Sequence, residues 1–516
     1  MTERIRAMQA QHMNEDNRRW WTLGAMCFAL FMIMLDNTVV NVALPSIEHD
    51  LNATLSSLEW TVNAYTLTFA VLLVTGGRLG DIFGRRRMFL FGVVVFALSS
   101  AAIALAPGQS WLIAGRAVQG IGAAFMMPGT LSIISNTFPP EERGRAIGTW
   151  AGVSALALAI GPVVGGALTE YVSWRAIFFL NLPVAVGAVA VTLYAARESR
   201  DETTRHTVDW PGIVTLSMGL TALVLALVEA NAWGWGSARI LGLLGLAAVG
   251  ILAFLVLEPR VREPMVDFSF FRSRTFLGAN VVAFIVSFAM LAMFFFMALY
   301  MQNILGYSPV QAGVRFLPAT LMVVVIAPVA GRLADRIGPR PPMVVGLLLV
   351  STSLFLETRI DVTTGYSLLL PSFVLMGLGM ALVMSPMSTA GMNAVRPEKA
   401  GVASGTLSMS RMVGGTFGVA VLGALFQHLA NNKLTELLSG TSVTSAQRSE
   451  IVHNLGSGGL SNVDPRIAAA AKEAFIHALA NGMWLSAGVA LTGAVVAALF
   501  IGRTTAMPAK PAAEPA

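Results

Sequence analysis

The sequence contains a single cysteine, and few of its residues carry a charge. Cys27 has no second cysteine with which to form an internal disulfide, and it lies in an apolar stretch where a thiol packs as a small apolar group. Charged residues make up 12% of the 516 residues, whereas soluble globular domains carry about 25%. This low charge content excludes an ordinary soluble domain.

Two other absences limit the chemistry of the chain. The six histidines lie in loops or near the ends of apolar segments, and none has a partner at metal-ligand spacing. No P-loop sequence supports ATP-driven transport. The net charge of +6 does not require a nucleic acid, because the basic residues collect in short loops between apolar segments. We therefore expect no enzyme, catalytic residue, metal or cofactor.

Long apolar segments make up most of the chain. Hydrophobic residues account for 55% of the sequence, and the mean hydropathy is +0.69. About 20 apolar residues allow a helix to cross a bilayer, and fourteen segments of this kind are present. The predicted membrane helices cover residues 20–44, 57–77, 88–106, 111–136, 145–169, 175–196, 209–229, 238–257, 275–301, 311–331, 341–357, 366–388, 400–426 and 476–502.

The loops between these segments predict the orientation of the chain. Arginine and lysine are concentrated in the N-terminal segment and in every second loop, which is the pattern of cytoplasmic loops. Since the number of spans is even, both termini are expected in the cytoplasm. The first span is too long for a signal-peptide core, so we expect no cleavage. The sequence thus predicts an all-α, multi-pass protein of the inner (cytoplasmic) cell membrane, in contact with the lipid bilayer.

One charged sequence occurs twice. GRLGDIFGRRR at Gly77–Arg87 returns as GRLADRIGPRP at Gly331–Pro341, each time between two apolar segments. A repeated loop between hydrophobic spans indicates two related halves, which is a transporter architecture. The residues that match at one fixed offset are Gly77, Asp81, Gly84 and Arg86 with Gly331, Asp335, Gly338 and Arg340.

The repeat divides the fourteen helices into six, two and six. The polar loop 428–475 ends with Asp464 and Pro465, which have the pattern of a helix N-cap followed by proline in the first turn. The tail is rich in proline and alanine and is expected to be disordered. The predicted domains are an N-terminal six-helix bundle (1–196), two additional helices with flanking loops (197–274), a C-terminal six-helix bundle (275–502) and the disordered tail (503–516).

Three further motifs lie in the first, fourth and fifth predicted helices. They read Leu35-Asp36-Asn37-Thr38-Val-Val-Asn41-Val-Ala-Leu-Pro45, Arg116-Ala-Val-Gln119-Gly120-Ile-Gly122, and Gly152 followed by Gly161-Pro162-Val-Val-Gly165-Gly166. Together with the repeated loop they resemble the motifs of the major facilitator superfamily, and the first is similar to that of its fourteen-helix drug:proton antiporter branch. The resemblance covers essentially the whole chain. It implies the major facilitator fold and proton-coupled antiport by alternating access.

The resemblance also implies a role for the charged loop. In the family this loop is thought to latch the two halves together, and a carboxylate at position 81 suits free N–H groups at a helix start. The alternative is a topology signal alone. The second copy departs from the pattern, with Ala334 in place of Gly80 and Pro339 in place of Arg85. The latch residues predicted in this way are Gly77, Asp81, Gly84, Arg85 and Arg86.

The fifth predicted helix carries the antiporter motif of the family. Gly148 with Gly152, and Gly161 with Gly165, form GxxxG pairs that permit close helix contact, and a proline favours a bend. We expect a tight helix between the halves that limits proton leak, with static packing as the alternative. The motif residues are Gly152, Gly161, Pro162, Gly165 and Gly166.

Few ionisable residues lie well within the predicted spans. Inserting an aspartate or arginine at the centre of a membrane helix costs roughly 2.5–3.5 kcal/mol. At about 1.5 Å per residue, Asp36 and Arg116 lie roughly 12 and 8 Å from the outer ends of their spans, so they can interact. We predict that this pair couples transport to protons and that Asp36 also binds cationic substrates; a fixed structural ion pair is the alternative. Glu59 and Glu229, near outer ends, are the next candidates. Arg411 lies deep in its span, and the sequence suggests no acidic partner for it.

Two methionine stripes occur at helical spacing. They comprise Met290, Met293, Met297 and Met301, and Met376, Met380, Met384 and Met387. Such stripes usually pack in a core or against lipid, but by family correspondence these two spans also line the transport cavity, and flexible thioethers suit varied apolar shapes. The methionines assigned to the substrate site are Met290, Met293, Met297, Met380 and Met384.

The sequence as a whole predicts a multidrug efflux transporter driven by the proton gradient, with a role in antibiotic resistance. Its expected partners are protons and small hydrophobic compounds, with cations favoured; no nucleic acid is expected, and a monomer is the simplest state. A dedicated exporter of one endogenous metabolite, lipid or siderophore is the close alternative. A sensor or receptor would not need titratable groups within the membrane.

Overall fold

The computed structural model describes residues 15–51, 55–200, 209–261, 264, 266, 268–307, 309–361, 364–439 and 464–502. In this part of the chain, fourteen long α-helices are present and no β-strand is present. The helices are α2 (Glu15–Leu51), α3 (Leu55–Phe83), α4 (Arg85–Ala104), α5 (Gln109–Thr137), α6 (Pro140–Tyr171), α7 (Trp174–Ala195), α8 (Trp210–Trp233), α9 (Ala238–Leu257), α10 (Arg274–Leu299), α11 (Pro309–Ile337), α12 (Arg340–Glu357), α13 (Tyr366–Asn393), α14 (Ala400–Leu437) and α16 (Pro465–Phe500).

The helices agree with the predicted spans. Each predicted span coincides with one helix, and thirteen helices are long and apolar enough to cross a membrane by length and composition. The remaining helix, α6, has 32 residues and is also long enough for a bilayer at about 1.5 Å per residue. These findings are compatible with fourteen spans. The predicted tail 503–516 lies outside the described residues.

Two groups of six helices pack in the same pattern. In the N-terminal bundle, defined as α2–α7, α3 packs on α5 and α2 packs on α6; in the C-terminal bundle, defined as α10–α14 and α16, α11 packs on α13 and α10 packs on α14. Between the bundles, α3 contacts α14 and α6 contacts α11. The internal repeat of the sequence therefore corresponds to a repeated packing. The predicted domain limits at 196 and 274 stay a prediction.

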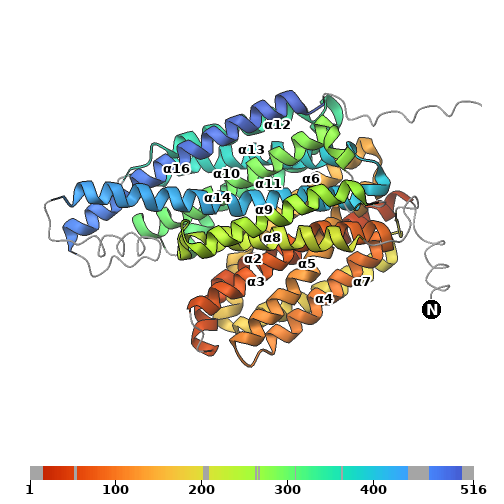
Figure 1. Ribbon diagram of the computed structural model, residues 1–516, viewed down its shortest axis with the longest axis horizontal. Coiled ribbons are helices and arrows are strands. Elements are labelled where there is room, and N and C mark those ends of the chain that lie inside the picture. Colours follow the sequence, from red (N-terminus) through yellow and green to blue (C-terminus); the bar gives the residue numbers. More distant parts are fainter. Residues whose placement is uncertain are drawn as a thin grey trace, which may run out of the picture.

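Helices α8 and α9 form a separate pair that lies across both bundles (Figure 1). α8 contacts α3 and α14, one helix from each bundle, and α9 packs on α8. α8 and α9 approach each other closely at Gly219 and Gly250. A Cβ atom added to Gly250 would lie only 2.7 Å from the Cα atom of Gly219. Glycine permits such close contact between membrane helices.

The outer surface of the bundles is apolar. Leu98 on α4, Val186 on α7 and Leu499 on α16 are each about two-thirds exposed, at 66, 69 and 67%. Large apolar side chains in these numbers are unfavourable in water but match the acyl chains of a bilayer. Together with the long apolar helices, this surface identifies a multi-pass membrane protein.

The repeated charged loops have the same backbone form. Gly84 separates α3 from α4 with φ of 109°, and Gly338 follows α11 with φ of 85°. Residues with a side chain rarely adopt such positive φ values, whereas glycine does so readily. Glycine at both positions of the repeat therefore permits the tight turn between consecutive helices.

The last helix begins as predicted. The Asp464 side chain accepts a hydrogen bond from the backbone N–H of Arg466 at 2.8 Å, and Pro465 occupies the first turn of α16. The predicted N-cap is confirmed. Residues 440–463 of the polar loop lie outside the described residues.

Candidate functional site

Asp36 and Arg116 form a direct ion pair inside the N-terminal bundle. The Nη1 atom of Arg116 on α5 lies 2.5 Å from Oδ2 of Asp36 on α2. The exposed fractions of the two residues are only 2 and 1%. The two charges that the sequence placed at similar depth are therefore in contact, and the surrounding helices shield both from solvent.

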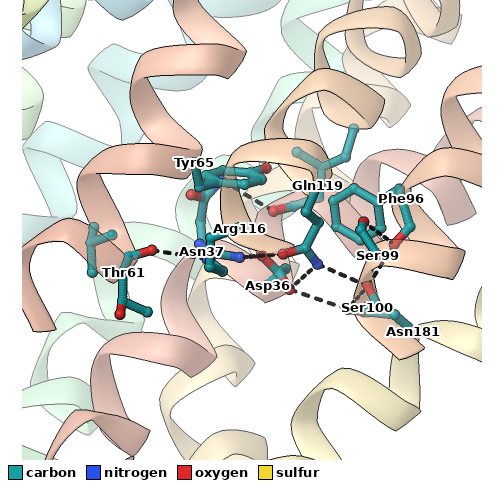
Figure 2. A network of polar contacts seen from close by, with 12 residues as sticks. Asp36, Asn37, Thr61, Tyr65, Phe96, Ser99, Ser100, Arg116, Gln119 and Asn181 are labelled. Atoms are coloured by element: carbon teal, nitrogen blue, oxygen red, sulfur yellow. Dashed lines mark hydrogen bonds and ion pairs between the residues drawn. The ribbon is translucent and has the colours of Figure 1, made fainter. Parts of the chain in front are cut away.

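Three uncharged side chains complete the network around Asp36 (Figure 2). The amide of Gln119 donates to Oδ1 of Asp36 at 2.9 Å, and that of Asn181 on α7 donates to the same oxygen at 3.1 Å. Both amides also donate to the hydroxyl of Ser100 on α4, at 2.8 and 3.2 Å. Both carboxylate oxygens thus accept hydrogen bonds, as a buried polar group requires.

Arg116 is held on its other side by α3 (Figure 2). Its Nε donates to the carbonyl of Thr61 at 3.1 Å, and its guanidinium lies 4.2 Å from the ring centroid of Tyr65. Nη1 also donates to Oε1 of Gln119 at 2.6 Å. The network therefore joins five helices of one bundle. Sequence reasoning did not find Ser100 and Asn181, because only the fold brings α4 and α7 next to the two motif helices.

A carboxylate joins the bundles where α3 meets α14. Asp81, fully buried, accepts hydrogen bonds from the backbone N–H groups of Gly401 and Val402, each at 2.9 Å. These residues lie in the first turn of α14, where N–H groups lack partners within the helix and the helix dipole favours a negative charge. A Cβ atom on Gly77 would collide with the carbonyl oxygen of Gly401, so glycine permits this contact.

Arg85 strengthens the same contact. Its Nε donates to Oδ1 of Asp81 at 2.7 Å, and its Nη2 donates to the carbonyls of Pro397 and Glu398 at 2.7 and 2.6 Å. Arg86, by contrast, stays within its own bundle and donates to the carbonyl of Ala196 at 3.0 Å. Of the two arginines predicted as latch residues, only Arg85 contacts the other bundle through these bonds.

The second copy of the motif makes the reciprocal contact. Asp335 on α11 accepts from the backbone N–H groups of Gly144 and Arg145 on α6 at 3.1 and 3.2 Å, and a Cβ atom on Gly331 would collide with the carbonyl oxygen of Gly144. Asp335 is half-buried, and Pro339 replaces the arginine of the first copy. We call the two contacts, made by Gly77, Asp81 and Arg85 and by Gly331 and Asp335, the interbundle clamp.

The glycines of helix α6 pack against two different helices. At one end, a Cβ atom on Gly148 would lie 2.8 Å from Pro328 Cα on α11, and one on Gly152 would lie 3.1 Å from the Val324 carbonyl oxygen. At the other end, a Cβ atom on Gly161 would collide with the hydroxyl of Thr38 on α2. One pair thus faces the C-terminal bundle, and the other faces the helix that carries Asp36.

The predicted methionine stripes are largely buried. Met293 and Met297 on α10 are fully buried, Met380 on α13 is 6% exposed, and Met290 and Met384 are half-buried. All five pack against the apolar core of the molecule. Their predicted role in substrate binding stays a prediction.

Glu357 is an acid that sequence reasoning missed. It is the last residue of α12 and is fully buried. Its Oε1 accepts from the hydroxyl of Ser372 on α13 at 2.6 Å, and Ser372 in turn contacts Ser353 at 2.9 Å. From the sequence this glutamate marks the end of an apolar segment, so nothing distinguishes it from a residue at the membrane surface.

Comparisons with known proteins agree with these features. The sequence profile of the Major Facilitator Superfamily matches residues 26–419. The chain is 40% identical over 408 residues to the tetracenomycin C resistance and export protein of Streptomyces glaucescens, covering 79% of this chain and 76% of that protein. It is 37% identical over 405 residues to the multidrug resistance protein Stp of Mycobacterium tuberculosis, covering 78 and 75%.

A solved structure supports the fold. The structure of the proton:xylose symporter XylE, bound to 6-bromo-6-deoxy-D-glucose, superposes with a TM-score of 0.61 over 93% of this chain and 95% of that chain. The sequence identity is 14%, so the likeness concerns the arrangement of the helices alone.

Proposed function

The chain belongs to the Major Facilitator Superfamily, and we propose that it is an efflux transporter that exports hydrophobic drugs and antibiotics in exchange for protons. The names of its relatives in Streptomyces and Mycobacterium, which refer to antibiotic export and multidrug resistance, support this function. We place the protein in the inner (cytoplasmic) membrane with both termini in the cytoplasm, as the loop charges favour.

The single observation that carries the proton coupling is the buried network around Asp36. A carboxylate within a membrane bundle is costly and serves a function in most cases. Protonation of Asp36 removes its charge attraction to Arg116, while Gln119 and Thr61 still accept from that arginine. The network therefore has a charged and a neutral form, which is what a proton-coupled step requires.

Helix packing offers a route from this network to the other bundle. Thr38 lies half a turn after Asp36 on α2 and faces Gly161 of α6. The same α6 packs against α11 through Gly148 and Gly152. A shift of α2 that follows protonation is transmitted along α6, because packed helices without gaps move together.

The interbundle clamp supplies the alternation of access. In the present conformation both clamp contacts are made, so the end of the molecule that carries the repeated loops is closed. By the proposed orientation this is the cytoplasmic end. Release of both contacts opens it for substrate from the cytoplasm, and their formation closes it while the opposite end releases the substrate.

Transport by purified protein in proteoliposomes tests the function. An imposed pH gradient should drive the movement of dyes such as ethidium and rhodamine 123, and a protonophore should stop it. Asp36→Asn keeps a hydrogen-bond acceptor but removes the charge, so it should abolish gradient-driven transport, and Asp36→Glu should retain part of it. Movement of several unrelated dyes favours a multidrug exporter over a dedicated one.

Asp50→Asn is the matched control. Asp50 lies on the same helix, but it is exposed and pairs with Trp174 and Arg175 near the helix end. Hydrogen bonds from the Trp174 indole and from Arg175 lower the pKa of Asp50, so it stays ionised at transport pH and cannot carry the proton. This variant should transport like wild type. If folded Asp36→Asn protein kept pH-driven antiport, the coupling residue would have to be sought elsewhere, with Glu229 and Glu357 next.

A further inference from the structure

Arg411 carries a positive charge that has no role in the proposed transport cycle. It lies on α14 about 16 Å from the helix start at roughly 1.5 Å per residue, well inside a hydrocarbon core about 30 Å thick. Its Nε and Nη2 atoms are buried, and they have no hydrogen-bond partner in the described part of the chain. A guanidinium in this position has donors available for a ligand.

The surroundings of Arg411 come from both bundles. Its guanidinium carbon lies 5.6 Å from the ring centroid of Trp150 on α6, and the indole of Trp150 is anchored by a 3.1 Å hydrogen bond to Thr130. Arg411 therefore lies where the C-terminal bundle faces the N-terminal bundle. This is the region in which alternating access exposes a substrate to one side and then to the other.

The same face of α14 has further unused polar atoms. Two serines precede Arg411 on this helix. Ser404 is followed by Ser408 after four residues and by Arg411 after another three, and these spacings place all three on one side of the helix. Both serines are buried, and their hydroxyl oxygens also lack a hydrogen-bond partner within the described residues. A line of unmatched donors within a membrane helix indicates a site that is completed by a ligand.

The carboxylates of the two motifs, on α2 and α3, are already engaged and do not neutralise Arg411. Asp36 is engaged by Arg116, and Asp81 is engaged by Arg85 and by the start of α14. A buried cation without an anion is unfavourable. An anion that enters with the substrate removes this penalty, and its charge is then attracted to Arg411 in a medium of low polarity.

We propose that Arg411 binds a carboxylate carried by the transported compounds, so that aromatic acids belong to the substrate class of this exporter. The inference rests on the proposed function and deepens it. The planar guanidinium presents parallel N–H donors to both oxygens of a carboxylate. Trp150 orients the guanidinium by a cation–π contact. Ser408 and Ser404 lie about one and two turns away along the same face, where they can hydrogen-bond other polar atoms of the compound.

Two dyes that differ in one group test the proposal. Rhodamine 110 carries a free carboxylate, and rhodamine 123 is its methyl ester. Binding of each dye to the purified full-length protein is measured by fluorescence anisotropy. Arg411→Gln should raise the Kd of rhodamine 110 roughly tenfold or more, equivalent to about 1.4 kcal/mol, and should leave that of rhodamine 123 nearly unchanged. Arg411→Lys should lose less, because the charge remains while the paired donors are lost.

Arg239→Gln is the matched control. Arg239 on α9 also lies 5.6 Å from a tryptophan ring, that of Trp233, but it is exposed. Its removal should change neither Kd. If Arg411→Gln and Arg411→Lys bind the acid as tightly as wild type, or weaken acid and ester equally, the proposal is wrong. Failure of the proposed function gives a different result, since wild-type proteoliposomes would then move neither dye along a pH gradient.

Discussion

Asp81→Asn is the change that most directly tests how the bundles are held together. The substitution preserves the shape of the side chain but removes the charge that faces Gly401, Val402 and Arg85. Loss of one partner from a buried ion pair costs about 3–5 kcal/mol. If this cost falls on the closed conformation alone, the open population rises roughly 10²- to 4 × 10³-fold, at about 1.4 kcal/mol per tenfold change.

The repeat supplies a matched variant, Asp335→Asn. Asp335 contacts the other bundle from the equivalent position of the repeat, but its bonds to Gly144 and Arg145 are longer, and Pro339 replaces the arginine of the first copy. Those residues also lie beyond the first four N–H groups of α6, which are the ones that lack partners within a helix. We therefore expect a smaller cost of about 1–2 kcal/mol.

Labelling of a single cysteine measures the open population. Ser404→Cys, in a Cys27→Ala background, places a thiol on α14 one turn behind the clamp at a fully buried position. An impermeant maleimide added from the cytoplasmic side should label it slowly in the parent, faster with Asp335→Asn and fastest with Asp81→Asn. Equal labelling rates in all three proteins, or a larger effect of Asp335→Asn, would refute the argument.

Two further predictions concern helix contacts. Gly161→Ala places a Cβ atom against the Thr38 hydroxyl, so it should cost about 1–3 kcal/mol and slow transport. Thr38→Ala in addition should restore both in part, because it removes the hydroxyl but leaves the Cβ atom of residue 38 at 2.8 Å. Melting of the purified proteins and transport in proteoliposomes check this. Gly250→Ala places a Cβ atom 2.7 Å from Gly219 Cα and should lower the melting temperature by separating α8 from α9. Its transport per folded molecule should be unchanged, because the polar network uses no residue of these helices.

The sequence predicts the helices of this protein well because the membrane imposes a simple rule. Each span must be an apolar helix of about 20 residues, so hydropathy locates it without knowledge of its neighbours. The same rule fails at helix ends outside the membrane. α14 continues to Leu437 and α16 begins at Pro465, whereas the predicted spans end at 426 and begin at 476. Hydropathy reports the apolar part of a helix and not its full length.

The candidate site was predictable only in part. The contact of Asp36 with Arg116 follows from depth along two helices, since a rise per residue converts sequence position into height. The contributions of Asn181 and Ser100 depend on which helices are neighbours, and no local pattern encodes that. Glu357 was missed for the same reason: its partner Ser372 lies on the next helix, and a terminal glutamate has the same pattern in sequence whether it faces solvent or is buried.

The structure gives α6 a position that links the parts of the site. One end of this helix receives Asp335 and packs on α11, and the other end packs on α2 beside Asp36. Between these ends Trp150 faces Arg411 of the opposite bundle. A single helix therefore contacts three parts of the proposed mechanism: the helix that carries the proton-coupling residue Asp36, the proposed substrate-binding residue Arg411, and one contact of the interbundle clamp. Because one continuous helix contacts all three sites, we expect movement of α6 to couple their responses.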